Sequence, residues 1–171
     1  MRSILILSDK SSGSSALQQH LLSLPGVHCV ERTRHYERET LYWVKAASLL
    51  NLPQVNMMAS EVPIAPRKAR KDLTRLLQQN IAGYQPPSDD RKLVMQGWRS
   101  LSQRFSPIFL EKSPHHLHQW SALQLISQCM KRYPEISFLV IGLVRNPMDT
   151  LYSMWSRWRL SPEERQHEWL L

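Results

Sequence analysis

The sequence is poor in the features that mark secreted and membrane-spanning proteins. It has only two cysteines, Cys29 and Cys129, too far apart to suggest a disulfide framework or a zinc cluster. We expect both to be small buried hydrophobic residues. No apolar run approaches the roughly 18 residues that a membrane span needs. The apolar residues 4–7 are followed at once by the polar residues 8–10, which is not a signal-peptide pattern. We therefore expect a cytoplasmic protein without a membrane span.

Internal repeats and low-complexity tracts are also absent. A chain of 171 residues with 42% hydrophobic content fits one buried core, and we predict a single domain over residues 1–171. The 22 Lys and Arg outnumber the 14 Asp and Glu, giving a net charge of +8. Such a charge attracts nucleic acid, phosphorylated ligands or acidic acceptors. Because no nucleic-acid-reading helix or stacking motif is recognisable, we predict no nucleic-acid partner.

Hydrophobic periodicity predicts alternating strands and helices. Apolar runs indicate strands near residues 4–7, 27–30, 108–110 and 138–144, and helical spacing indicates helices near 17–24, 39–50, 67–81, 93–105, 117–130 and from 147 onward. This alternation is typical of an α/β fold in which helices cover both faces of a parallel sheet in three layers. Ligands bind such sheets at the carboxyl ends of the strands, and each motif described next follows a strand.

The loop after the first strand has the composition of a phosphate-binding turn. Its polar residues are Lys10, Ser11, Ser12, Gly13, Ser14 and Ser15. A glycine turn that leads into a helix directs backbone N–H groups and the positive end of the helix dipole at an anion. The loop is neither a Walker A sequence nor a dinucleotide fingerprint. An ordinary serine-rich turn with a helix cap is the alternative interpretation.

A second strand–turn–helix unit is a further candidate anion site. Arg145 stands where the strand ends, Pro147 suits the first helical position, and Ser153 follows about two turns along the helix. A guanidinium group matches phosphate oxygens, and a hydroxyl can complete the donor set. A surface arginine paired with Asp149 is the alternative.

Together these motifs resemble the sulfotransferases that use 3′-phosphoadenosine 5′-phosphosulfate (PAPS). The resemblance rests on residues 12–15, on residues 145–147 with Ser153, and on Glu111-Lys112-Ser113-Pro114, which is similar to the E-K-[ST]-P segment of carbohydrate and bacterial members. It runs from about Ile4 to Trp158. It implies a P-loop-like sheet in which the first loop holds the 5′-phosphosulfate and Arg145 and Ser153 bind the 3′-phosphate.

The resemblance also implies a chemistry, the transfer of a sulfuryl group from PAPS to a hydroxyl or amine. In the family, the lysine at the position of Lys112 assists transfer, and we expect Lys10 to help it. Many members carry Lys or Arg where this chain has Ser11. The general base is a His or a Glu: Glu31 resembles the base of protein-tyrosine sulfotransferases, and His115 is its rival. Glu37 and Glu39 are further rivals, although a solvated face and a first helical turn are their more ordinary roles.

Other interpretations stay open. Family members usually continue beyond the second anion site, so the chain is alternatively an incomplete domain that binds PAPS with weak or no catalysis. A nucleotide or small-molecule kinase is a further alternative, which the missing Walker A sequence disfavours. The acceptor is a small molecule, a carbohydrate or a peptide.

Histidines and tryptophans need no special role. The spacing of His115, His116 and His118 is not that of a helical metal site, so we predict no metal. Trp155 and Trp158 recur at helical spacing and indicate a core or interface face, which leaves a homodimer open. For Trp43, Trp98 and Trp120 we favour the core over an acceptor pocket.

Overall fold

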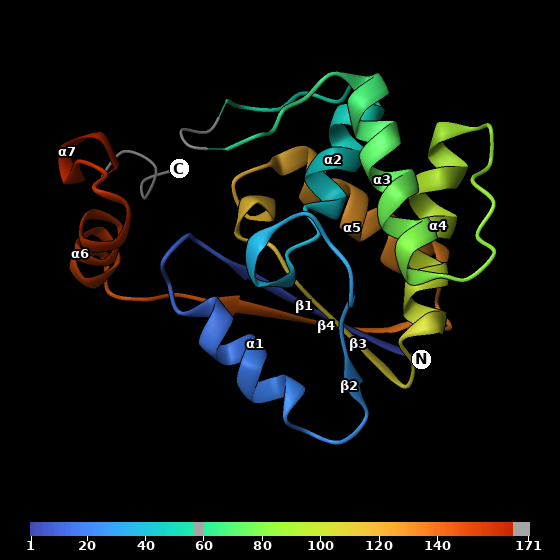
Figure 1. Cartoon of the computed structure of the whole chain (residues 1–171), viewed down its shortest axis with the longest axis horizontal. Helices are drawn as coiled ribbons and strands as arrows, with labels where there is room; N and C mark the ends of the chain where they lie inside the picture. The colour runs from blue at the N-terminus through green and yellow to red at the C-terminus, as the bar shows by residue number, and fades with distance from the viewer. Residues whose placement is uncertain (57–59, 166–171) are drawn as a thin grey trace.

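A computed structural model describes residues 1–56 and 60–165. The strands are β1 (Arg2–Ser8), β2 (Val27–His28), β3 (Ile108–Lys112) and β4 (Ser137–Leu143). They form one parallel sheet in the order β2-β3-β1-β4. Figure 1 shows helices on both sides of this sheet. The prediction of a three-layer α/β fold is therefore confirmed.

The longer helices lie close to their expected positions. They are α1 (Ser14–Leu22), α2 (Tyr42–Leu49), α3 (Pro66–Asn80), α4 (Asp90–Arg104), α5 (Trp120–Arg132) and α6 (Pro147–Trp158). Two 3-10 helices, η1 (Tyr36–Arg38) and η2 (Pro114–His116), and the short α7 (Pro162–Arg165) complete the described elements. Helix α1 lies on one face of the sheet and α2–α5 lie on the other (Figure 1). Among the described residues, no helix is both long and apolar enough to cross a membrane.

The alternation of side chains along β1 explains the two layers. Ile4 and Ile6 point to the face that α1 covers, where they meet Leu17 and Leu21. Leu5 points to the opposite face and joins the larger core formed by α2–α5. A strand that is covered on both faces must be apolar at successive positions rather than at alternate ones. This requirement accounts for the uninterrupted run at residues 4–7.

The larger core is built around aromatic rings. Trp43 and Trp98 have no exposed surface, and their ring centroids lie 4.8 Å apart. Tyr42 packs edge-on against both indoles, and its buried hydroxyl donates to the carbonyl oxygen of Val94 over 2.7 Å. Gly97 permits this approach, because a Cβ there would lie 2.6 Å from the Tyr42 oxygen. The expected core role of the two tryptophans matches this packing.

The other tryptophans lie outside this core. Trp120 is 72% exposed at the start of α5, so its expected core role is wrong. Helix α6 projects beside the sheet together with α7 (Figure 1), and Trp155 and Trp158 are exposed on it. Strand β4, which lies at the sheet edge, likewise exposes apolar side chains. Helical spacing correctly places apolar residues on one face of α6, but in the described structure that face is open.

The segment before α2 departs most from expectation. The sequence predicts a helix from residue 39, but α2 begins at Tyr42. Glu37, Arg38 and Leu41 adopt left-handed backbone conformations, with φ of 56°, 59° and 51°. Such angles are uncommon for residues other than glycine. These turns fold residues 36–41 back over the carboxyl ends of the strands.

Candidate functional site

The loop between β1 and α1 is a compact polar turn. Gly13 caps α1 with a φ of 92°, in the left-handed region that glycine adopts without steric cost. The Ser12 hydroxyl donates to the carbonyl oxygen of Asp9 over 2.6 Å. No acidic residue lies in the first turn of α1, so the helix itself carries no negative charge at its positive end. Ser14 and Ser15 are the first two residues of α1 and do not cap it.

Lys112, at the end of β3, is the buried cation of the site. Its side chain is 1% exposed, and Nζ donates to Ser15 Oγ over 3.1 Å. Nζ also lies 2.8 Å from Glu39 Oε1 and 3.3 Å from Glu37 Oε2. The Ser15 hydroxyl donates to the same Glu37 oxygen. We call these four residues, Lys112, Ser15, Glu37 and Glu39, the lysine–carboxylate cluster.

The carboxylates of this cluster have unequal environments. Burial raises the pKa of Glu39, and the nearby Lys112 opposes that rise without cancelling it. Glu39 is 18% exposed and Glu37 is 29% exposed. A carboxylate with a raised pKa takes up a proton more readily than an ordinary surface glutamate. Glu39 is therefore suited to accept a proton beside Lys112.

Buried polar residues fix the segment that carries Glu39. Glu111, which is 2% exposed, accepts hydrogen bonds from the hydroxyls of Thr40, over 2.7 Å, and Ser113. The Ser113 hydroxyl in turn accepts from the backbone N–H of Leu41 over 3.0 Å. Burial by itself raises the pKa of Glu111, but His116 and the two hydroxyls outweigh it and lower that pKa. Glu111 therefore remains a carboxylate that ties residues 40–41 to the end of β3.

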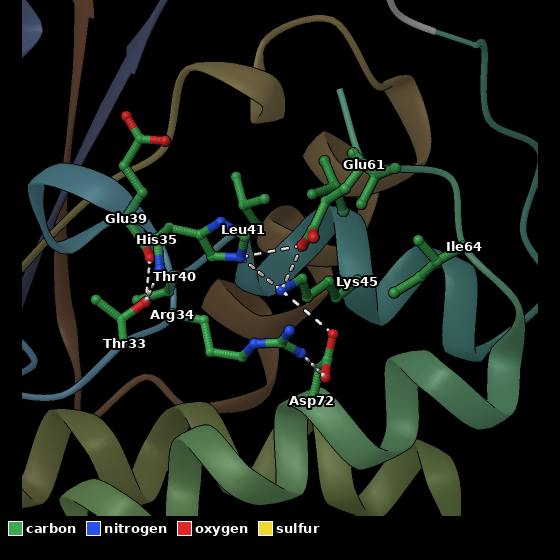
Figure 2. A network of polar contacts seen from close by, with 12 residues as sticks. Thr33, Arg34, His35, Glu39, Thr40, Leu41, Lys45, Glu61, Ile64 and Asp72 are labelled. Carbon is green, nitrogen blue, oxygen red and sulfur yellow. Dashed lines mark hydrogen bonds and ion pairs between the residues drawn. The ribbon is translucent and has the colours of Figure 1, made fainter. Parts of the chain in front are cut away.

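A second polar network supports the same segment from the side of α2 and α3. Lys45, 4% exposed, lies 2.8 Å from Glu61 and 3.7 Å from Asp72, and its Nζ lies 2.8 Å from His35 Nε2. Burial, and then Lys45, lower the pKa of His35. In Figure 2 these side chains meet between the two helices, whereas the Glu39 carboxylate points away from them. The network therefore anchors the segment and leaves Glu39 to the lysine–carboxylate cluster.

The second anion motif contacts the loop between β1 and α1 through Arg145. Arg145 donates to the carbonyl oxygen of Ser11 over 3.1 Å, so the segments after β1 and β4 are adjacent. Ser153 lies on α6, and among the described residues no hydrogen bond joins its side chain to Arg145 or to the loop. The Asn146 side chain caps α6 by accepting from the backbone N–H of Met148.

The two predicted bases lie in different surroundings. Glu31 is 70% exposed and lies 3.9 Å from Arg104; both line a hollow of about 410 Å³ that includes no member of the lysine–carboxylate cluster. His115 is 9% exposed, and burial, followed by the charge of Lys10, lowers its pKa to about 3. A group with such a pKa is neutral at pH 7 and a weak base. The structure thus brings Glu37 and Glu39, rather than Glu31, to Lys112.

His116 and His118 face separate carboxylates. His116 Nε2 lies 3.3 Å from the buried Glu111, and His118 Nε2 lies 2.9 Å from Asp9. Within residues 1–56 and 60–165, no group of three or more His, Cys, Asp or Glu side chains is arranged to hold a metal ion. Sequence reasoning missed the Asp9–His118 pair. The sequence carries a signal for this pair, because Asp9 follows β1 and His118 follows β3. The carboxyl ends of parallel strands lie at the same edge of the sheet.

Comparison with known proteins adds no relative: no protein-family model, no curated protein and no solved structure matches the chain.

Proposed function

We propose that the chain binds PAPS at the carboxyl ends of β1, β3 and β4 and transfers its sulfuryl group to a hydroxyl or amine. One observation carries the proposal, namely the convergence of three segments far apart in the sequence. Lys112 contacts Ser15, and Arg145 contacts Ser11. Cations from two strands therefore flank one serine–glycine loop, which is the arrangement that a ligand with two separated anionic groups requires.

The donors present suit the 5′-phosphosulfate end. Ser14, Ser15 and the start of α1 offer hydroxyl groups and a helix N-terminus, and Lys112 offers a buried ammonium group. Arg145 is exposed beside Ser11 and would take the 3′-phosphate. Among the described residues, no hydrogen bond joins Ser153 on α6 to Arg145 or to the loop. We therefore assign the 3′-phosphate to Arg145 and leave Ser153 out of the proposed site.

In the proposed reaction the acceptor oxygen or nitrogen forms a bond to sulfur as the bond between sulfur and the bridging oxygen of the 5′-phosphate breaks. The acceptor proton passes to the Glu39 carboxylate, which lies beside Lys112 and has a raised pKa. The leaving phosphate gains negative charge, and Lys112 and Ser15 stabilise it. As in phosphoryl transfer, positioning and electrostatic stabilisation supply most of the catalysis.

A domain that binds PAPS without transferring sulfate is the second candidate. It is favoured by the enclosure of Lys112, which is 1% exposed and already contacts two carboxylates. The two candidates differ in product formation. A catalytic domain converts PAPS to 3′-phosphoadenosine 5′-phosphate (PAP) in the presence of an acceptor panel, and its Glu39→Gln variant loses at least about a hundredfold of that rate. A binding domain forms no PAP above background.

The nucleotide site itself is tested with Arg145→Ala and titration calorimetry against PAP. Hydrogen bonds to charged groups contribute about 1.5–3 kcal/mol, so we expect the variant to bind PAP roughly tenfold to a hundredfold more weakly. Arg157→Ala, which removes an exposed arginine from α6, is the matched control and should bind normally. Normal PAP binding by Arg145→Ala would show that this arginine does not hold the 3′-phosphate.

A further inference from the structure

A basic groove runs along α3, and the lysine–carboxylate cluster includes none of its residues. Four cations line it: Arg67, Arg70, Lys71 and Arg75. The remaining lining residues are Thr74, Gln78 and Pro86, the last from the loop before α4, and the hollow measures about 450 Å³. Among residues 1–56 and 60–165, no carboxylate lines this groove.

The lining residues follow a stripe along α3 that begins with two cations and ends with two neutral polar side chains. Arg67, Lys71, Thr74 and Gln78 follow one another at intervals of four, three and four residues, which places them on one side of the helix. The span from first to last is about 16 Å at 1.5 Å per residue. Such a length suits an extended chain rather than a single small anion.

Most of these cations form no ion pair in the described part of the chain. Arg70 is engaged, since it pairs with Asp90 and donates to the carbonyl oxygen of Pro87 over 2.6 Å. Within the part of the chain that the structure describes, no carboxylate forms an ion pair with Arg67, Lys71 or Arg75. Unneutralised like charges on one helix face repel one another. A bound polyanion would relieve that repulsion.

The neutral lining distinguishes among polyanions. Single-stranded nucleic acids bind grooves in which aromatic rings stack on bases, and no aromatic ring from the described part of the chain lines this groove. Peptides dock through apolar anchor pockets or by adding a strand to a sheet edge, whereas the walls here are a helix and a loop with one apolar residue, Pro86. The hydroxyl of Thr74 and the amide of Gln78 both donate and accept hydrogen bonds, which matches sugar hydroxyls.

We propose that the α3 groove is a binding surface for an acidic polysaccharide, whose sulfate or carboxylate groups contact Arg67, Lys71 and Arg75. Arg75 also lines a second, much smaller hollow together with Arg34 and Thr40, and Thr40 belongs to the segment that Glu111 fixes. If the proposed sulfuryl transfer is correct, the bound polysaccharide is its acceptor; this acceptor role rests on the proposed function, whereas the binding does not.

The test measures binding of a fluorescein-labelled sulfated octasaccharide by anisotropy, without nucleotide and at several salt concentrations. The variant combines Arg67→Gln, Lys71→Gln and Arg75→Gln. We expect it to bind at least about tenfold more weakly than the native chain. Affinity falls as salt rises, and the magnitude of the slope of log affinity against log salt should decrease by about two in the variant. Each cation that pairs with the polyanion contributes roughly 0.7 to that magnitude. We expect the variant to fold because Arg67 and Lys71 are exposed, and circular dichroism verifies this.

A control variant removes the same charge elsewhere, through Lys92→Gln, Lys131→Gln and Arg157→Gln, which are exposed on α4, α5 and α6. It should lose less than about threefold, because it alters only the long-range field. Equal losses in both variants would overturn the proposal, since they would reflect net charge alone. Tighter binding of a single-stranded DNA with the same charge would also overturn it. If the native chain bound the octasaccharide but did not bind PAP, that result would contradict only the proposed function.

Discussion

The Glu37 carboxylate occupies the position in which an anionic ligand would meet Lys112. Its Oε2 atom contacts both Lys112 Nζ, over 3.3 Å, and the Ser15 hydroxyl. These are the donors that we assign to the phosphosulfate. An incoming nucleotide must therefore displace Glu37 or bind beside its negative charge. Substituting Glu37→Gln removes the charge, keeps the side-chain length and should tighten nucleotide binding.

The size of this effect follows from Coulomb's law. Two unit charges about 5 Å apart interact with roughly 3 kcal/mol at an effective dielectric constant of about 20. Glu37 is 29% exposed, so solvent and salt screen part of this repulsion. We therefore expect a gain of about 1.5 kcal/mol, which corresponds to roughly tenfold tighter PAP binding.

Titration calorimetry with PAP at low and moderate salt measures this change. Glu135→Gln is the matched control, because it also removes one negative charge but from a surface pair with Arg99. It should leave the affinity within about twofold. If Glu37→Gln bound PAP as weakly as the native chain or more weakly, the carboxylate would not compete with the ligand, and our placement of the phosphosulfate at Lys112 would be refuted.

Two further predictions concern stability. The His115 pKa of about 3 lies below its ordinary value of 6.5, so its contribution to stability is present above pH 6.5 and is lost as the pH falls toward 3. His115→Gln should therefore flatten the acid side of a urea-unfolding profile, by on the order of 5 kcal/mol at its limit, and the matched control is His20→Gln at an exposed position of α1. Gly97→Ala should lower the free energy of unfolding by about 1–3 kcal/mol, because its Cβ would lie 2.6 Å from the Tyr42 oxygen, and Gln96→Ala on the exposed face of α4 should be nearly neutral; equal effects of both alanines would contradict the close packing described here.

The sequence is most informative where local chemistry and topology agree. Apolar runs locate the strands, and the rule that parallel strands align their carboxyl ends brings the loop at residues 10–15, Lys112 and Arg145 to one edge. The contacts of Lys112 with Ser15 and of Arg145 with Ser11 are consistent with that reasoning. The alignment of parallel strands is enough to anticipate these contacts.

The carboxylates of the site are harder to anticipate. Glu37 and Glu39 reach Lys112 because residues 37, 38 and 41 turn through left-handed conformations, and no glycine marks these turns. Buried residues remote in sequence, above all Glu111 and Asp72, hold the segment in place. Similarly, helical spacing indicates that α6 has an apolar face but cannot indicate whether the face is covered. Such features depend on tertiary contacts rather than on local sequence preference.

Comparing PAP with ADP in titration calorimetry tests the central claim most directly. Both ligands carry an adenosine and two phosphates, but only PAP has one at the 3′ position. We predict that PAP binds at least about tenfold more tightly, through a charge-assisted contact with Arg145. Equal affinities, or tighter binding of ADP, would contradict the assignment of a 3′-phosphate site and would favour a kinase-type nucleotide site instead.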